Sequence, residues 1–211
     1  IAIGLDGGVQ YALEGSVFMA GALMQWLRDD MGIIDDVAET SAIARSVNST
    51  DGVYVVPAFT GLGAPYWDMY ARGALLGVTR GTSKAHLCRA VLESIAYESL
   101  DLFRAMEAGS GVQISELRVD GGASRSRFLM QYQADILHCA VRQPVCLETT
   151  ALGSAMLAGL AVGVWDSLEE LSTIWKLGHA YAPQIEPGEE AAALRRWHKA
   201  VERSRNWDNA E

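Results

Sequence analysis

The chain is poor in cysteine. Its 211 residues include three, Cys88, Cys139 and Cys146, and no C-x-x-C pair. An odd number at these positions gives neither a disulfide framework nor a zinc-binding pattern. We therefore expect a reducing compartment and a cytoplasmic location.

Basic residues are scarce relative to acidic ones. The chain has 17 lysines and arginines against 26 aspartates and glutamates, so its formal net charge is −9. Such a chain has no basic surface excess to attract a polyanion, and we expect no nucleic-acid partner. A single nucleotide is not excluded, because a few local donors suffice to hold phosphate groups.

Long apolar segments are also absent. The uncharged run over residues 149–165 is shorter than the roughly 20 apolar residues of a membrane span, and it contains several glycines. We expect a buried helix there and no membrane span. The first residues, Ile1-Ala2-Ile3, are strand-like and show neither an initiator methionine nor a signal-peptide pattern, which favours a fragment of a longer protein.

Half of the residues are hydrophobic, enough to build the core of one α/β domain. Apolar periodicity and turn residues predict strands at 1–5, 9–13, 53–57, 74–78, 116–119 and 140–146, and helices at 15–28, 35–47, 84–108, 127–137 and 150–162, the last capped by Thr150. A short helix and a polar tail should follow. Without internal repeats or linkers, we assign residues 1–178 to one domain and residues 179–211 to its helical tail.

The helix expected over residues 84–108 has an apolar stripe that runs from Leu87 to Met106. We place the carboxylates of Glu93, Glu98 and Asp101 mostly on its outward side. Glu93 and Glu98 are five residues apart and diverge around the helix, so they are not a catalytic pair.

The most informative stretch is Leu117-Arg118-Val119-Asp120-Gly121-Gly122-Ala123-Ser124. An apolar run that ends in an acid, two glycines and a hydroxyl residue predicts a strand, a tight turn and a helix. Glycines expose backbone N–H groups, and the first turn of a helix favours an anion. Arg125 and Arg127 oppose the helix dipole and so strengthen the case for a bound phosphate. The alternative is a well-packed α/β connection with solvated arginines.

Two further features leave alternatives open. Gly21 and Gln25 stand one helical turn apart and could flank a flat ligand, although the residues by themselves favour close packing of a neighbouring helix. The segment over residues 59–73 is rich in glycine and aromatic residues, which is typical of a functional loop. We interpret Tyr66 and Trp67 as anchors buried against the core rather than as ligand contacts.

Ordered motifs extend this picture along almost the entire chain. They are Tyr11-Ala12-Leu13-Glu14-Gly15, Gln25-Trp26-Leu27-Arg28-Asp29, Gly61-Leu62-Gly63-Ala64-Pro65-Tyr66-Trp67-Asp68, Val119-Asp120-Gly121-Gly122 and Ala158-Gly159-Leu160-Ala161-Val162-Gly163, with the pair Gly73-x-Leu75-x-Gly77-Val78 and His86-Leu87-x-x-Ala90-Val91-Leu92-Glu93 at characteristic spacing. Together they resemble the C-terminal domain of the glycerol kinases, in the carbohydrate kinase family of the actin-like, ribonuclease-H-like ATPase fold. The resemblance implies a mixed sheet with helices on both faces and a helical C-terminal tail.

The resemblance also implies site residues. Nucleotide contacts are expected at Gly21, Gln25, Gly121, Gly122 and Ser126, which reverses the packing interpretation of Gly21. Ser126 departs from the family, since relatives commonly have asparagine there, and the flanking arginines are unlike the family pattern as well.

The implied reaction is transfer of the γ-phosphoryl group of ATP to glycerol, with Mg²⁺, giving glycerol 3-phosphate and ADP. The polyol site, the catalytic base and the metal ligands belong to the family's N-terminal half, so we expect no catalytic or metal-binding residue in this chain and no activity from it alone. The expected partners are ATP or ADP, glycerol in the intact enzyme, the N-terminal domain and further copies in a homo-oligomer.

Two alternatives remain: another sugar kinase of the same family, acting for example on xylulose or gluconate, and a non-catalytic actin-like nucleotide-binding module. A dinucleotide-binding oxidoreductase is disfavoured, because no G-x-G-x-x-G motif follows a strand.

Overall fold

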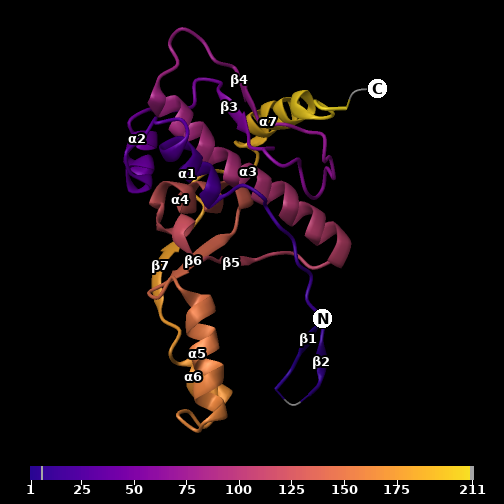
Figure 1. The fold of residues 1–211 in the computed structure, drawn as a ribbon, viewed down its shortest axis with the longest axis vertical. Coiled ribbons are helices and arrows are strands. Elements are labelled where there is room, and N and C mark those ends of the chain that lie inside the picture. The colour runs from indigo at the N-terminus through magenta and orange to yellow at the C-terminus, as the bar shows by residue number, and fades with distance from the viewer. Residues whose placement is uncertain (6, 210–211) are drawn as a thin grey trace.

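The computed structural model describes residues 1–5 and 7–209 and shows a mixed α/β chain (Figure 1). The strands are β1 (Ala2–Ile3), β2 (Val9–Gln10), β3 (Tyr54–Val56), β4 (Ala74–Leu76), β5 (Glu116–Arg118), β6 (Ala140–Pro144) and β7 (Leu177–Tyr181). The helices are α1 (Gly21–Asp29), α2 (Thr40–Arg45), α3 (Lys84–Ser110), α4 (Arg127–Leu137), α5 (Thr149–Ala161), α6 (Leu168–Ser172) and α7 (Ala191–Ser204), with the 3₁₀ turns η1 (Val37–Glu39) and η2 (Gly122–Arg125).

The described strands form three small sheets. β1 with β2 and β3 with β4 are antiparallel pairs, whereas β5 and β6 run parallel and β6 and β7 antiparallel. The order β5, α4, β6 is the strand, turn and helix arrangement that the Asp-Gly-Gly stretch predicts, and α4 has the bounds expected from its periodicity. The mixed sheet is therefore confirmed for β5, β6 and β7.

Several boundaries differ from the sequence-based expectations. The N-terminal hairpin is confirmed, although residue 6 of its turn lies outside the described residues. α1 begins at Gly21 rather than at Gly15, since residues 15–20 are irregular or bent and none of them is buried. β7 was not predicted, because its residues are exposed and carry no alternating pattern.

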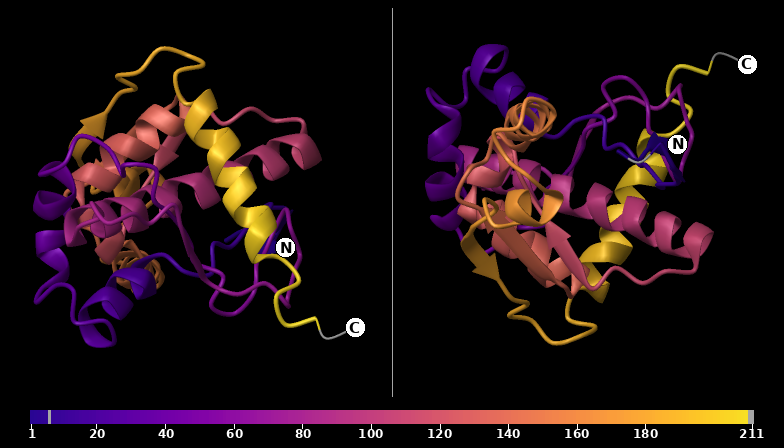
Figure 2. Two further views of the ribbon diagram at one scale, coloured as in Figure 1. Left: turned by 90° about the horizontal axis from the view of Figure 1, so that it is seen from above. Right: turned by 90° about the horizontal axis from the view of Figure 1, so that it is seen from below.

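The core is organised around the long helix α3. One buried cluster joins α3 to α1, α2 and α4 through residues such as Leu27, Leu92 and Met130. A second cluster joins α3 to α7 and to the β3–β4 hairpin, with Trp197 and Tyr97 among its buried side chains. Both views in Figure 2 show α1 and α2 at one edge of the body and α7 apart from them. α3 thus separates two packed regions and fixes their positions.

The prediction that the carboxylates of α3 face outward is wrong for Glu93 and Asp101. Each is 6% exposed, because helices or strands cover α3 on several sides. Glu93 is paired with Arg89 at 2.7 Å and accepts a hydrogen bond from the Tyr132 hydroxyl at 3.1 Å. Burial raises the pKa of Glu93 even though these partners favour its charged form.

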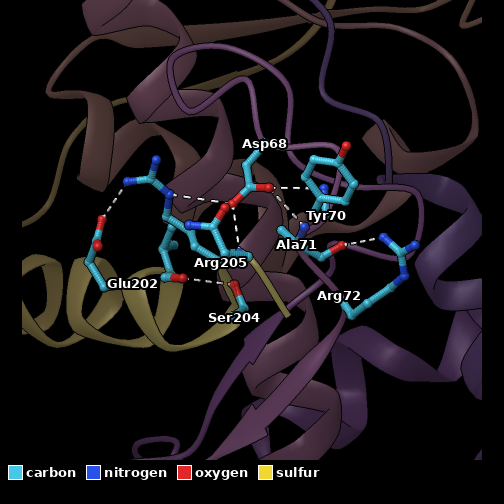
Figure 3. Close-up of polar contacts among 9 residues, drawn as sticks. Asp68, Tyr70, Ala71, Arg72, Glu202, Ser204 and Arg205 are labelled. Atoms are coloured by element: carbon cyan, nitrogen blue, oxygen red, sulfur yellow. Dashed lines mark hydrogen bonds and ion pairs between the residues drawn. The ribbon is translucent and has the colours of Figure 1, made fainter. Parts of the chain in front are cut away.

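The loop over residues 59–73 is held by Asp68, which is 6% exposed (Figure 3). Its carboxylate accepts hydrogen bonds from the backbone N–H groups of Tyr70 at 2.9 Å, Ala71 at 3.0 Å and Asn206 at 2.9 Å. Burial favours a raised pKa for Asp68, but these backbone donors and the nearby Arg205 guanidinium hold it below its ordinary value. The loop is therefore tied to the residues that follow α7.

The two aromatic residues of this loop behave differently. The Tyr66 hydroxyl donates a 2.6 Å hydrogen bond to the Asp101 carboxylate, so the anchor interpretation is correct for Tyr66. Trp67 is 77% exposed and anchors nothing in the core, so the same interpretation is wrong for it.

α5 and the β1–β2 hairpin project from the body (Figure 1). The expected buried helix is not observed: Gly159, which lies against the Trp165 ring, is the one buried residue of α5. Thr150 does not cap the helix, because α5 begins at Thr149 and its N-cap residue Glu148 makes no side-chain cap. The described part of the chain provides no further surface that would cover this apolar helix. None of the described helices is both long and apolar enough to cross a membrane.

Candidate functional site

A cavity of about 600 Å³ opens between α1, the η1–α2 segment and the turn that precedes α4. Four of the five residues that the resemblance singles out line it: Gly21, Gln25, Gly122 and Ser126. These residues come from segments about 100 positions apart in the sequence. The fold therefore brings the two predicted halves of the site together.

Gly121 shapes the turn and does not line the cavity. Its backbone has φ +73° and ψ −177°, a conformation open essentially to glycine. Its N–H donates to the Leu147 carbonyl at 2.8 Å, and its own carbonyl accepts the Ser124 hydroxyl at 2.7 Å. Gly121 thereby directs the chain from β5 into η2.

Gly122, the first residue of η2, has open space beside its Cα atom. A Cβ atom added there would meet no described atom within 4 Å. Gly122 is also one of the residues that line the cavity. The absence of a side chain lets a ligand approach the backbone of the turn.

The N-terminus of α4 meets the same cavity. Ser126 is its N-cap residue, and its hydroxyl accepts the Leu129 N–H at 3.3 Å. The hydroxyl oxygen of Ser126 also lies 2.7 Å from that of Ser41 on α2. Helix N-termini carry free N–H groups and a partial positive charge, so this end of the cavity favours an anionic group.

On the α1 side, Gly21 and Gln25 face the cavity. A Cβ atom built at Gly21 would have no described atom within 4 Å, so Gly21 is not the point of a close helix contact. Gln25 is exposed, and its amide makes no hydrogen bond to any described residue. Both positions are free to contact a ligand.

The charge around the cavity is opposite to that of the whole chain. Four arginines line it, Arg28, Arg45, Arg125 and Arg127, against the single acidic residue Asp36, in a chain of net charge −9. Concentrating positive charge in one concave site of an acidic protein favours an anionic ligand.

The four arginines are not equally available. Arg28 is paired with Asp29 at 2.7 Å, which raises the pKa of Arg28, and Arg125 lies 3.7 Å from Glu148. Within residues 1–5 and 7–209, no ion pair or hydrogen bond engages the guanidinium of Arg45 or Arg127. These two are the charges most available to a ligand.

Sequence reasoning missed Arg28, Arg45 and Ser41 as site residues. Ser41 and Arg45 lie one helical turn apart on the short helix α2, and both line the cavity. Their sequence signal is only a weak amphipathic pattern, which says nothing about the remote turn that the helix faces.

The described residues do not fit a metal ion. No group of three or more histidine, cysteine, aspartate or glutamate residues among them could hold one. Asp36 is the single acid at the cavity, and its Oδ1 atom already accepts the Ala38 N–H at 2.9 Å.

Comparison with known proteins adds independent observations. Residues 3–162 match the FGGY family of carbohydrate kinases, C-terminal domain. The glycerol kinase of Petrotoga mobilis is 56% identical over 207 residues, covering 98% of this chain and 42% of the relative. That of Clostridium beijerinckii is 54% identical over 208 residues, covering 99% and 42%. This chain thus spans about two fifths of the length of the curated relatives it matches.

Among solved structures, Plasmodium falciparum glycerol kinase with ADP has a TM-score of 0.79 at 34% identity, covering 87% of this chain and 37% of that one. A xylulose kinase from Lactobacillus acidophilus has a TM-score of 0.67 at 24% identity, covering 86% and 37%, and shows likeness of fold alone. The α/β fold class and the resemblance to the glycerol kinases are confirmed.

Proposed function

The chain belongs to the FGGY family of carbohydrate kinases and corresponds to that family's C-terminal domain, and from this premise we propose that it is the ATP-binding half of a glycerol kinase. The whole enzyme would transfer the γ-phosphoryl group of ATP to glycerol, giving glycerol 3-phosphate and ADP. The sequence identity to proteins named glycerol kinase supports glycerol as the acceptor. The xylulose and gluconate kinases are similar at 23–24% identity and support only the fold.

The observation that carries this proposal is the unpaired positive charge beside the open turn. Arg45 and Arg127 lack partners among the described residues, Gly122 exposes its backbone, and α4 begins at the same cavity. Di- and triphosphates bind to such combinations of backbone N–H groups and guanidinium groups.

In this proposal the chain positions the donor nucleotide. The Gly121–Gly122 turn and the start of α4 hold the phosphates, while Gly21 and Gln25 flank the nucleoside. Positioning of this kind, followed by closure against the acceptor domain, lowers the barrier by aligning the reactants and excluding water. Mg²⁺, when bound, neutralises charge on the phosphoryl oxygens, and its ligands would come mainly from the N-terminal domain. The base that takes the glycerol proton would also belong to that domain, so the chain alone would transfer no phosphoryl group.

We further propose that the N-terminal domain docks where α5 and the β1–β2 hairpin project. Exposed apolar side chains there include Tyr11 at 82%, Leu157 at 52% and Val162 at 78% exposed. Apolar surface of this extent is typical of an interface. Association of the whole enzyme into a homo-oligomer stays a prediction.

The test is a single polypeptide in which the N-terminal domain of the Petrotoga mobilis relative precedes residue 1. We expect glycerol-dependent ADP release from this protein and none from the 211-residue chain alone. Xylulose and gluconate should support less than about one hundredth of that rate. A folded fusion that binds ADP but phosphorylates none of the three would contradict the catalytic proposal and favour a non-catalytic nucleotide-binding module.

A further inference from the structure

This inference rests on the proposed nucleotide site and concerns how its phosphate-facing side is held in place. We propose that Arg89 of α3, which does not line the cavity, positions the guanidinium groups of Arg45 and Arg127 for the phosphates of the nucleotide. Arg89 is then a positioning residue, because it acts through two other arginines and contacts no ligand atom.

The guanidinium group of Arg89 contacts a different partner on each of three sides. Its Nε atom donates to the Glu93 carboxylate at 2.7 Å, one helical turn further along α3. Its Nη1 atom donates to the Val47 carbonyl at 2.6 Å. Its Cζ atom lies 5.1 Å from the centre of the Phe128 ring, within the range of a cation–π contact. The side chain is 17% exposed, so these contacts fix its position.

The two segments that Arg89 reaches each carry one of the cavity arginines that have no partner among the described residues. Val47 lies two residues after Arg45, which ends α2. Phe128 directly follows Arg127, which begins α4. Arg89 therefore joins the end of α2 to the start of α4 from outside the cavity, and it sets the distance between the backbones that carry the two free guanidinium groups.

The cavity needs such a connection for two reasons. Arg45 and Arg127 carry like charges and line the same cavity, so they repel each other when no ligand is bound. The helix α2 has six residues, and a helix of this length is marginal without tertiary contacts. The hydrogen bond from Arg89 to the carbonyl just beyond α2 holds this helix against the repulsion.

Arg89 is itself held by a closed set of contacts between α3 and α4. The Phe128 ring stacks on the Tyr132 ring with the ring centroids 5.8 Å apart. The Tyr132 hydroxyl donates to Glu93 at 3.1 Å, and Glu93 pairs with Arg89 at 2.7 Å. A planar guanidinium group serves the carboxylate, the carbonyl and the ring at once, which a lysine ammonium cannot do.

The experiment measures the ADP dissociation constant of the 211-residue chain by calorimetry, in a double-mutant cycle between Arg89→Met and Arg45→Ala. We expect Arg89→Met to weaken ADP binding about tenfold, although residue 89 lies outside the cavity. Adding Arg45→Ala should weaken binding by less than about threefold more, because Arg45 is already misplaced. A purely structural role of Arg89 would leave the two effects independent, so that Arg45→Ala would cost its full factor of about ten.

Two further variants keep the test interpretable. Arg89→Met leaves the buried Glu93 without its charged partner, so its folding is checked by circular dichroism. If it does not fold, Arg89→Met/Glu93→Gln takes its place with Glu93→Gln as the reference, because no unpaired buried charge then remains, and the same loss is expected. Arg104→Met is the matched control: Arg104 is exposed, lies about four turns further along α3 and does not line the cavity, so ADP affinity should stay unchanged.

Two results would overturn the inference. One is an ADP dissociation constant within about twofold of that of the parent in a folded variant that lacks Arg89. The other is a full loss of about tenfold when Arg45→Ala is added to that variant, since Arg89 would then stabilise the fold without shaping the site. Absence of ADP binding by the unmodified chain would instead overturn the proposed nucleotide site.

Discussion

The indole N–H of Trp197 donates a 2.7 Å hydrogen bond to the carboxylate of Asp101, 96 positions earlier in the chain. Trp197 is fully buried and Asp101 is 6% exposed. The same carboxylate accepts the Tyr66 hydroxyl at 2.6 Å and lies 3.0 Å from the His198 ring nitrogen Nε2. One acid on α3 thus holds both α7 and the long loop.

We predict that Asp101→Asn lowers the free energy of unfolding by about 2–4 kcal/mol, because the amide nitrogen would face a buried donor. Urea denaturation followed by circular dichroism measures this change. Asp30→Asn, an exposed change at the end of α1, is the control and should alter stability by less than about 0.5 kcal/mol. Equal effects from the two substitutions would refute the role given to Asp101.

Glu98 gives a prediction about pH. Its Oε2 atom is buried without a hydrogen-bond partner among the described residues, and burial, together with the nearby Asp101 carboxylate, raises the pKa of Glu98 to about 8. The folded chain therefore holds this proton more tightly than the unfolded chain, in which the pKa is near 4.5. Its contribution to stability is complete below about pH 4.5 and is lost as the pH rises through about 8.

Glu98→Gln removes this titration. The variant should be more stable than the parent by about 2–4 kcal/mol at pH 9 and similar to it at pH 4.5. Chemical denaturation at several pH values provides the test. A stability difference that does not grow with pH would show that Glu98 ionises freely in the folded chain.

The two glycines of the turn should respond differently to substitution. Gly121→Ala forces a side chain into a glycine conformation and should cost about 1–3 kcal/mol of stability. Gly122→Leu meets no neighbouring atom at its Cβ and should change stability by less than about 1 kcal/mol, yet it should abolish ADP binding by filling the cavity. Thermal unfolding and ADP titration of both variants separate the effects. Tight ADP binding by Gly122→Leu would place the ligand elsewhere.

Asp68 and Asp208 allow a matched comparison at the C-terminal end. Asp68 is buried and joins the loop to residues 205 and 206 (Figure 3), whereas Asp208 forms an exposed pair with Arg72 at 2.5 Å. Asp68→Asn should raise amide hydrogen exchange in residues 204–208 by about tenfold or more. Asp208→Asn should change it by less than about threefold, because exposed pairs contribute little. The reverse order would contradict the role of Asp68.

Local patterns predicted the elements whose residues alternate or repeat clearly. The bounds of α4 and the turn at Gly121 and Gly122 follow from a strand-like run, two glycines and helical spacing. The burial of Glu93 and Asp101 could not be predicted, because their partners Tyr132 and Trp197 lie on other elements. A helical period shows which faces of a helix are apolar. It does not show which polar groups on the helix will form hydrogen bonds to a segment that is remote in the sequence.

The residues of the candidate site also differ in how far the sequence could predict them. Gly122 and Ser126 sit beside a recognisable turn, and Gly21 and Gln25 required the family resemblance. Ser41 and Arg45 needed the fold, since only the packing of α2 against α3 and α4 carries them to the cavity. The prediction that α5 is buried failed for a different reason. Its apolar composition favours burial, but the surface that would bury it is not among the described residues.

Calorimetric titration of the 211-residue chain with ADP, at low and at high salt, tests the central claim most directly. We predict saturable binding of one ADP, weakened about tenfold in both Arg45→Ala and Arg127→Ala and weakened further by salt. Arg195→Ala, an exposed change on α7 away from the cavity, should leave binding unchanged. An ADP affinity that is unchanged in both Arg45→Ala and Arg127→Ala, or no binding at any attainable ADP concentration, would contradict the assignment of this cavity as the nucleotide site.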